Sequence, residues 1–353
     1  MANNNTTTND SLTTFIAHLP KAELHVHLEG CLTPQLAQTL AQRNNVPLPN
    51  SVKQASTTSS SGFAFHDLSS FLAVYYSAMT VLQTAADFHD LAMDYLTKAH
   101  EQNVLHCELF FDPQAHTSRG VPFPTVVSGY RSAVLQAQRE LGVSTSLIMC
   151  FLRDMSAEFA MATLMDALPF KDCIIGVGLD SDERGNPPRK FAEVFERARK
   201  EGFMRTMHCD VDQVGSIEHI RQALEEIGVD RLDHGTNIVE DARLVEMVRE
   251  KRIGLTCCPI SNSVVCSDFK GKEIMQLFRQ GARVTINSDD PAYFRGYANE
   301  NVLRLAREEE LKVTRKELVG LMKNAFEISW ISSWSRDAFL KVLDEYAERH
   351  RIS

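Results

Sequence analysis

The sequence predicts an α/β fold, a closed (β/α)8 TIM barrel with extra helices after the first strand and at the C-terminus. Three observations carry this prediction. Eight near-continuous apolar segments alternate with amphipathic helical segments, which is typical of a parallel sheet covered by helices. Polar residues gather at the C-terminal ends of these segments, where such barrels build their sites. The chain also has no Gly-x-Gly-x-x-Gly turn to mark the dinucleotide crevice of an open sheet.

The first strand lies in Glu23–Gly30, and it contains two histidines. Side chains alternate along a strand, so His25 and His27 project from one face while the apolar residues project from the other. Before this strand, residues 1–12 are polar and rich in Asn and Thr, which predicts a disordered tail. This segment lacks the charged and apolar regions of a signal peptide. We expect residues 13–353 to form one barrel domain.

The segments after the first strand predict helices and one long loop. A helical pattern runs from Pro34 to Asn44, with proline at its N-terminal end, as helices prefer. Residues 50–62 are rich in Ser and Thr and have no apolar periodicity, so we expect a mobile loop. Beyond them, the apolar residues recur at the spacing of a helix that buries one face, namely Phe88, Leu91, Ala92, Tyr95 and Leu96.

The rest of the chain alternates regularly between strand and helix. Val104–Phe111 is apolar throughout and predicts a buried strand that stops at Asp112-Pro113. Further strands are predicted at Ser146–Phe151, Cys173–Leu179, Phe203–His208, Arg231–Asp233, Gly254–Cys258 and Arg283–Asn287. Helices are predicted at 124–142, 157–168, 190–201, 216–227, 242–251 and 272–280, and a charged helical tail from about residue 301 is expected to pack outside the barrel.

Composition narrows the class of protein. The 353 residues are 44% hydrophobic and carry a formal net charge of -9, which repels a phosphate backbone and argues against nucleic acid as a partner. No apolar run approaches the roughly twenty residues that span a bilayer. The eight cysteines include no Cys-x-x-Cys pair, and most lie in apolar strands. We therefore expect buried thiols in a reducing compartment, the cytoplasm and in a eukaryote the nucleus as well. Nothing in the sequence indicates an oligomeric state.

Ligand-type residues recur where the predicted strands end. The first strand ends in His25 and His27, the fifth in His208, and the eighth is followed by Asp289. Three imidazoles and a carboxylate suit zinc or a similar ion, with a coordination position left for water. Such an ion converts water into a nucleophile near neutral pH. His234, after the sixth strand, is the candidate to orient that water or to take its proton.

Each of these residues also has a simpler interpretation. His208 could bond a backbone carbonyl, His234 could be a loop histidine, and Asp289 or Asp290 could cap the following helix. The metal site is favoured because all of them fall at one rim of one barrel. His106 lies in mid-strand and is predicted to be a core histidine. Six further histidines are given no role in the site: His66, His89, His100, His116, His219 and His350.

Four motifs resemble one known family over nearly the whole chain, from about Leu19 to Phe339. They are Pro20–Gly30, Arg231–Gly235, Cys258–Asn262 and Ser288–Pro291. The sequence resembles the adenosine/adenine deaminase branch of the amidohydrolase superfamily, which are metal-dependent hydrolases of the barrel type. Within this branch it is most similar to adenine deaminases that act on the free base, through the stretches Phe110–Gln114, Gly178–Ser181, Gly185–Pro188 and Asp289–Phe294.

The resemblance implies an activity and roles for particular residues. The activity is hydrolytic deamination of an aminopurine, with hydroxide attacking the ring carbon that bears the amino group. The resemblance implies one zinc ion, held by His25, His27, His208 and Asp289, with His234 positioning the hydroxide. Binuclear relatives carry a carboxylated lysine at the end of the fourth strand. No lysine stands at that position here, which agrees with a single metal ion. It also implies that Asp290 bonds the imidazole edge of the purine, and that the base pocket is lined by Gly178, Asp180, Ser181, Glu183 and Glu29.

The chain departs from the family at one position. The family's fifth strand ends in His-Ala-Gly-Glu, whose Glu gives a proton to the ring nitrogen, and here the corresponding residue is Val211. A positioned acid contributes about 10²–10⁴-fold to such a step. Three hypotheses follow: Asp210 or Asp212 supplies the proton; the substrate is an N6-substituted adenine or another amino-heterocycle that needs the acid less; or the chain binds zinc and a purine without turnover.

Overall fold

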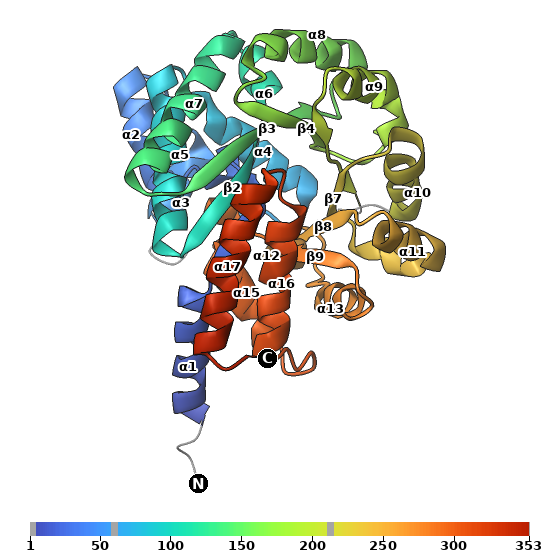
Figure 1. Cartoon of the computed structure of the whole chain (residues 1–353). Helices are drawn as coiled ribbons and strands as arrows, with labels where there is room; N and C mark the ends of the chain where they lie inside the picture. The colour runs from blue at the N-terminus through green and yellow to red at the C-terminus, as the bar shows by residue number, and fades with distance from the viewer. Residues whose placement is uncertain (1–4, 58–62, 210–214, 353) are drawn as a thin grey trace.

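The computed structural model describes residues 5–57, 63–209 and 215–352, and it confirms the predicted parallel barrel (Figure 1). Two sheets, of five and four strands, make up its wall, and every strand pair is parallel. The strands are β1 Lys21–His27, β2 Val104–Phe111, β3 Ser144–Leu152, β4 Ile174–Asp180, β5 Met204–Arg205, β6 His208–Cys209, β7 Arg231–His234, β8 Gly254–Cys257 and β9 Arg283–Ile286.

Backbone hydrogen bonds join the two sheets at both seams. The fifth predicted strand is divided into β5 and β6, which belong to different sheets, and between them Thr206 N–H donates to Val177 O over 3.0 Å. At the other seam Val26 pairs with Asp289 in an isolated parallel bridge. There His27 N–H donates to Asp289 O over 2.9 Å. The wall is therefore continuous, and the second seam places Asp289 directly beside the two histidines of β1.

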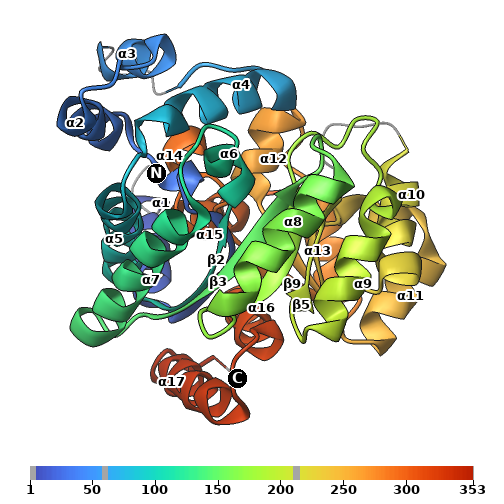
Figure 2. The same ribbon diagram turned by 90° about the horizontal axis from the view of Figure 1, so that it is seen from above.

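The helices form a layer around the strands, as the view from above shows (Figure 2). Most match the periodicity of the sequence within a few residues. They are α1 Asn5–His18, α2 Pro34–Asn44, α3 Asn50–Thr57, α4 Leu68–Ala78, α5 Ala85–Glu101, α6 Pro113–Thr117, α7 Phe123–Glu140, α8 Ala157–Ala167, α9 Ala192–Lys200, α10 Ser216–Arg221, α11 Ala242–Glu250, α12 Pro259–Val265, α13 Gly271–Arg279, α14 Pro291–Phe294, α15 Ala298–Ala306, α16 Arg315–Ile328 and α17 Ser333–Arg349.

Two segments differ from the sequence-based expectation. The expected tail over residues 1–12 is helical from Asn5 onward, because α1 is tied down further along: Phe15 is buried, and Tyr346 O–H donates to Phe15 O over 2.7 Å. The expected loop over residues 50–62 is helical in its first part, α3, where Val52 and Ala55 are buried on one side. Two apolar residues are too few to show a helical period. Residues 1–4 and 58–62 lie outside the described part of the chain.

The C-terminal helices cover the strands opposite the site. One hydrophobic cluster runs from Phe15 to Tyr346, and α16 packs on β9 and β1 (Figure 1). Under these helices the buried Arg231 pairs with Glu108 and lies 4.1 Å from the centre of the Trp330 ring. The predicted core histidine is confirmed, since His106 is fully buried and bonds Ser144 Oγ over 3.0 Å. The charged groups of this end are thus paired inside the fold.

The burial of the cysteines and the hydropathy of the helices match the expectations drawn from the composition. All eight thiols are free, and six of them are buried. Among the described residues no helix is both long enough and apolar enough to cross a bilayer.

Candidate active site

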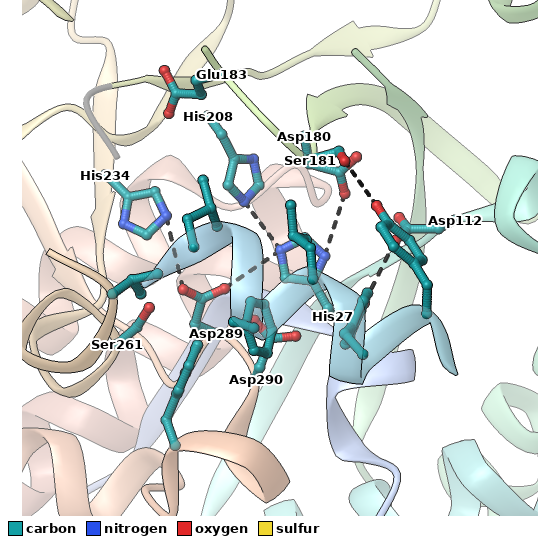
Figure 3. A pocket seen from close by; sticks show the side chains of 17 residues that line it. His27, Asp112, Asp180, Ser181, Glu183, His208, His234, Ser261, Asp289 and Asp290 are labelled. Atoms are coloured by element: carbon teal, nitrogen blue, oxygen red, sulfur yellow. Dashed lines mark hydrogen bonds and ion pairs between the residues drawn. The ribbon is translucent and has the colours of Figure 1, made fainter. Parts of the chain in front are cut away.

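Three strand ends bring four ligand atoms together at one rim of the barrel. His25 and His27 come from β1, His208 from β6, and Asp289 follows β9. His27 Nε2 lies 3.0 Å from His208 Nε2 and 3.4 Å from Asp289 Oδ1, while His25 Nε2 lies 3.3 Å from the same oxygen. The four atoms all lie within 4.8 Å of one another, and Figure 3 shows three of the four residues, His27, His208 and Asp289. The sequence placed these four residues in one ligand group, and the fold brings them together.

The donor set fits a divalent cation. Two ring nitrogens face each other at 3.0 Å, a carboxylate oxygen lies 3.4 Å from one of them, and a third imidazole completes the cluster of donor atoms. His25 Nε2 is buried and makes no hydrogen bond with the described residues. A buried nitrogen that makes no hydrogen bond is costly unless something else binds it. Nitrogen and oxygen donors in this number are those that zinc prefers.

A second layer of polar groups holds the rings in place. His25 Nδ1 lies 3.0 Å from Thr256 Oγ1, and that hydroxyl donates to Asp233 Oδ1 over 2.8 Å. Asp233 also lies near His208, with Oδ2 3.6 Å from Nδ1. On the other side Asp180 Oδ2 lies 3.5 Å from His27 Nδ1. Outer partners of this kind fix the orientation of metal-binding imidazoles and raise their basicity.

The environment favours the metal-binding form of three of the four ligands, His27, His208 and Asp289. Burial lowers the pKa of His27 to about 4, and burial together with the neighbouring imidazoles holds the pKa of His208 well below its usual value. Burial alone would raise the pKa of Asp289, but the adjacent His25 and other imidazoles hold it well below its ordinary range. Neutral imidazoles and an ionised carboxylate are what a cation requires.

His234 stands at the end of β7, beside the ligand group. Its Nε2 lies 3.8 Å from Asp289 Oδ2, and its Nδ1 lies 3.1 Å from Asn262 Oδ1. Burial lowers its pKa, so the ring is neutral and can accept a proton near neutral pH. His234, Asp289 and Ser181 all have positive φ, at 56°, 64° and 73°. Non-glycine residues in this conformation are strained and concentrate at functional sites.

A pocket opens over these groups, with about 490 Å³ of space not filled by atoms, open solvent included. One side is polar and contains the ligand group, while the other is apolar and formed largely by α4. The lining residues are His27, Leu68, Phe71, Leu72, Tyr75, Tyr76, Asp112, Asp180, Ser181, Glu183, His208, His234, Ser261, Val265, Asp289, Asp290 and Phe294.

Asp290 enters the pocket because the turn after β1 has a glycine. A Cβ atom on Gly30 would lie 2.0 Å from Asp290 Oδ1 and 2.8 Å from Asp290 Cα. No side chain larger than hydrogen fits there without moving Asp290. The carboxyl is buried, and its Oδ1 makes no hydrogen bond with the described residues, so it is available to a bound molecule.

Two residues expected in the pocket lining lie elsewhere. Glu29 is fully buried behind the wall, where His116 Nε2 and the Tyr130 hydroxyl each lie 2.8 Å from its Oε1. A buried carboxylate needs hydrogen-bond donors, and the donors to Glu29 lie further from the pocket than the strand wall. Gly178 faces the neighbouring strand, since a Cβ there would meet Cys150 Sγ at 2.5 Å. Asp180, Ser181, Glu183 and Asp290 do line the pocket. Asp210, Val211 and Asp212 lie outside the described residues.

Other lining residues were not singled out from the sequence. Asp112 faces Asp180, and Tyr75 O–H donates to Asp112 Oδ2 over 3.4 Å, while Tyr76 O–H donates to Ser181 Oγ over 2.8 Å. Burial raises the pKa of Asp180 to about 7, and burial and the charge of Asp180 raise the pKa of Asp112 well above its usual value. The helical spacing of α4 predicts its apolar face, but not that this face covers a pocket.

Comparison with known proteins shows similarity over most of the chain. The family model described as adenosine deaminase matches residues 20–346. A curated adenine deaminase of Zymomonas mobilis is 47% identical over 345 residues, which cover 96% of this chain and 99% of that protein. An uncharacterised deaminase of Schizosaccharomyces pombe is 47% identical over 336 residues, 95% of this chain and 98% of that protein.

Solved structures give the same fold. The crystal structure of an adenine deaminase from Arthrobacter aurescens superposes with a TM-score of 0.87 at 38% identity, over 94% of this chain and 99% of that one. The N6-methyl-AMP deaminase of Arabidopsis thaliana has a TM-score of 0.77 at 18% identity, over 96% and 100% of the two chains, and at that identity supports the fold alone.

Proposed function

Because the chain belongs to the adenosine deaminase family, we propose that this hydrolytic deaminase acts on adenine, converting its amino group to ammonia. The observation that carries the proposal is the buried group of three imidazoles and one carboxylate, of which His27, His208 and Asp289 line the pocket. The curated relatives of nearly equal length support adenine as the base on which this group acts.

We propose one zinc ion per chain, held by His25, His27, His208 and Asp289. The family is metal-dependent, and the donor set supports zinc. A bound zinc ion supplies Lewis-acid chemistry that makes water a nucleophile near neutral pH.

The chain's own residues orient the reactants and move protons. His234, with Nδ1 held by Asn262, accepts the proton of the attacking water at Nε2 and passes it to the leaving amino group. Asp290 bonds the imidazole edge of the base and so fixes the ring. Asp180 and Ser181 line the neighbouring wall. The apolar face of α4 excludes water from the remainder of the pocket.

A second candidate substrate is an N6-substituted adenine. The specific observation in its favour is the apolar pocket wall, which offers space and contacts for an alkyl group: Leu68, Phe71, Leu72, Val265 and Phe294. An alkylated amine would leave by the same hydrolytic route. Two further hypotheses are another amino-heterocycle and a zinc-retaining protein that binds a purine without turnover.

One experiment separates these functions. Zinc-loaded protein is incubated with adenine, adenosine, N6-methyladenine, isopentenyladenine, isoguanine and a pterin, while ultraviolet absorbance and released amine are followed. We expect turnover of adenine or of an N6-substituted adenine, and none of adenosine. Bound zinc without turnover of any compound would refute catalysis and favour the purine-binding hypothesis.

We also propose that the protein works on a free small molecule in a reducing compartment such as the cytoplasm. The eight free thiols support this setting, and the net charge of -9 disfavours nucleic acid as a partner.

A further inference from the structure

Glu183 is a buried carboxyl group in the pocket wall, with a side chain only 1% exposed. It follows β4 and lies between two basic groups. Arg153 Nη1 is 3.8 Å from Oε2, and His219 Nδ1, on α10, is 3.6 Å from the same oxygen. Two guanidinium N–H groups of Arg153 donate to backbone carbonyls, those of His208 at 2.7 Å and Asn186 at 2.9 Å. Arg153 therefore holds the surrounding loops while it faces Glu183.

Glu183 and Asp290 occupy opposite sides of the pocket. Figure 3 shows Glu183 beyond His208 and His234, with Asp290 on the other side of the ligand group. A planar base that bonds Asp290 through one edge turns its other edge away from Asp290. That second edge, which contains the ring nitrogen next to the amino-bearing carbon, then faces Glu183.

The chemistry requires an acid at that edge. When the oxygen of water bonds to the amino-bearing carbon, the C=N π bond breaks and its electron pair moves to the ring nitrogen, which must take a proton. The proton that water loses first goes to the amino group, and ammonia leaves. As C=O forms, the remaining hydroxyl proton is released to solvent, and an equivalent proton from solvent restores the acid. The sum is aminopurine plus water giving oxopurine plus ammonia.

The other described carboxyl groups of the pocket have different contacts. Asp289 belongs to the ligand group, and Asp290 lies at the opposite edge. Asp180 lies against the outer nitrogen of His27, with Asp112 beside it. Val211 has no proton to give. Among the described residues, this leaves Glu183 on the side where the proton is needed.

We propose, on the premise of the deaminase function above, that Glu183 donates the proton to the ring nitrogen and that His219 returns it from solvent. The His219 side chain is 12% exposed and reaches Glu183 from α10, so it connects a buried acid with bulk water. Glu183 is then a catalytic residue, and His219 is a proton relay behind it.

The test uses the zinc-loaded full chain with the best substrate of the panel above. Glu183→Gln should lower kcat by about 10²–10⁴-fold, with unchanged zinc content and unchanged binding of the oxopurine product. Glu183→Ala should be partly rescued by formate, a small acid that can enter the space left by the side chain. Glu218→Gln, an exposed carboxylate next to His219 in sequence, is the matched control and should keep wild-type activity.

His219→Gln tests the relay separately and does not depend on the folding of the Glu183 variants. Its kcat should be reduced and should rise with the concentration of imidazole buffer. Wild-type kcat in Glu183→Gln, loss of zinc from it, or Glu183→Ala activity that formate leaves unchanged would each overturn the proposal. So would a comparable loss in Asp210→Asn or Asp212→Asn alone. Failure of the wild-type protein on every substrate would instead refute the proposed deaminase function.

Discussion

Replacing Gly30 with alanine tests whether the pocket depends on the position of Asp290. The new Cβ would lie 2.0 Å from Asp290 Oδ1, 2.7 Å from Cγ and 2.8 Å from Cα. Rotating the carboxyl group relieves the first two contacts, but not the third, because Cα belongs to the backbone. Asp290 and the turn at Gly30 must therefore move apart by the order of 1 Å to reach ordinary contact distances.

The size of the effect follows from this displacement. Moving a positioning group by about 1 Å costs about 10²-fold in rate, which corresponds to about 2.7 kcal/mol of transition-state stabilisation. Overpacking a buried site typically also costs about 1–3 kcal/mol of folding stability. We therefore expect kcat/KM for adenine to fall by about 10²-fold in Gly30→Ala, with the zinc ligands still in place.

The assay measures kcat/KM, zinc per chain and the thermal unfolding midpoint for Gly30→Ala and for a matched control. Gly320→Ala is suitable, because Gly320 lies on α16 outside the barrel and the three atoms nearest the new Cβ all belong to the Phe278 ring, with Cζ at 2.8 Å. This control should change stability without changing kcat/KM. Wild-type kcat/KM in folded, zinc-replete Gly30→Ala would refute the role of Asp290 in holding the base.

Three further predictions concern the metal and the layer behind it. His208→Ala should lose stoichiometric zinc on dialysis and lose turnover with it, as metal analysis and the ammonia assay would show, whereas retention of both would exclude His208 as a ligand. Chelation of the wild type should lower the unfolding temperature, and added zinc should restore it. Burial raises the pKa of Glu29, but the hydrogen bond from His116 outweighs burial and holds this pKa below the ordinary 4.5. Glu29 should therefore stabilise the fold most at neutral pH, and its contribution is lost as the pH falls through the pKa of the folded state. The difference in unfolding free energy between wild type and Glu29→Gln should shrink in urea titrations as the pH falls below the ordinary 4.5; a constant difference would contradict this.

The sequence was most informative where a prediction depends only on the local periodicity of apolar residues or on the position of a residue at the end of a strand. The strand β2 has the bounds predicted from its apolar run, and the helix Pro34–Asn44 also matches. His25, His27, His208 and Asp289 could be grouped because parallel strands of a barrel end at one rim. The first part of α1, over residues 5–12, and helix α3 were missed because the few apolar residues that anchor them show no period.

What the sequence by itself determined is the alternation of elements and the identity of the ligand-type residues, because both depend on residue spacing along the chain. Only the tertiary structure decided which residues from distant segments contact one another and which of them line the pocket. It placed Glu29 behind the wall with His116, brought the apolar face of α4 over the pocket, and set Glu183 between Arg153 and His219. These outcomes depend on which buried polar groups find partners in three dimensions, and no local pattern encodes that pairing.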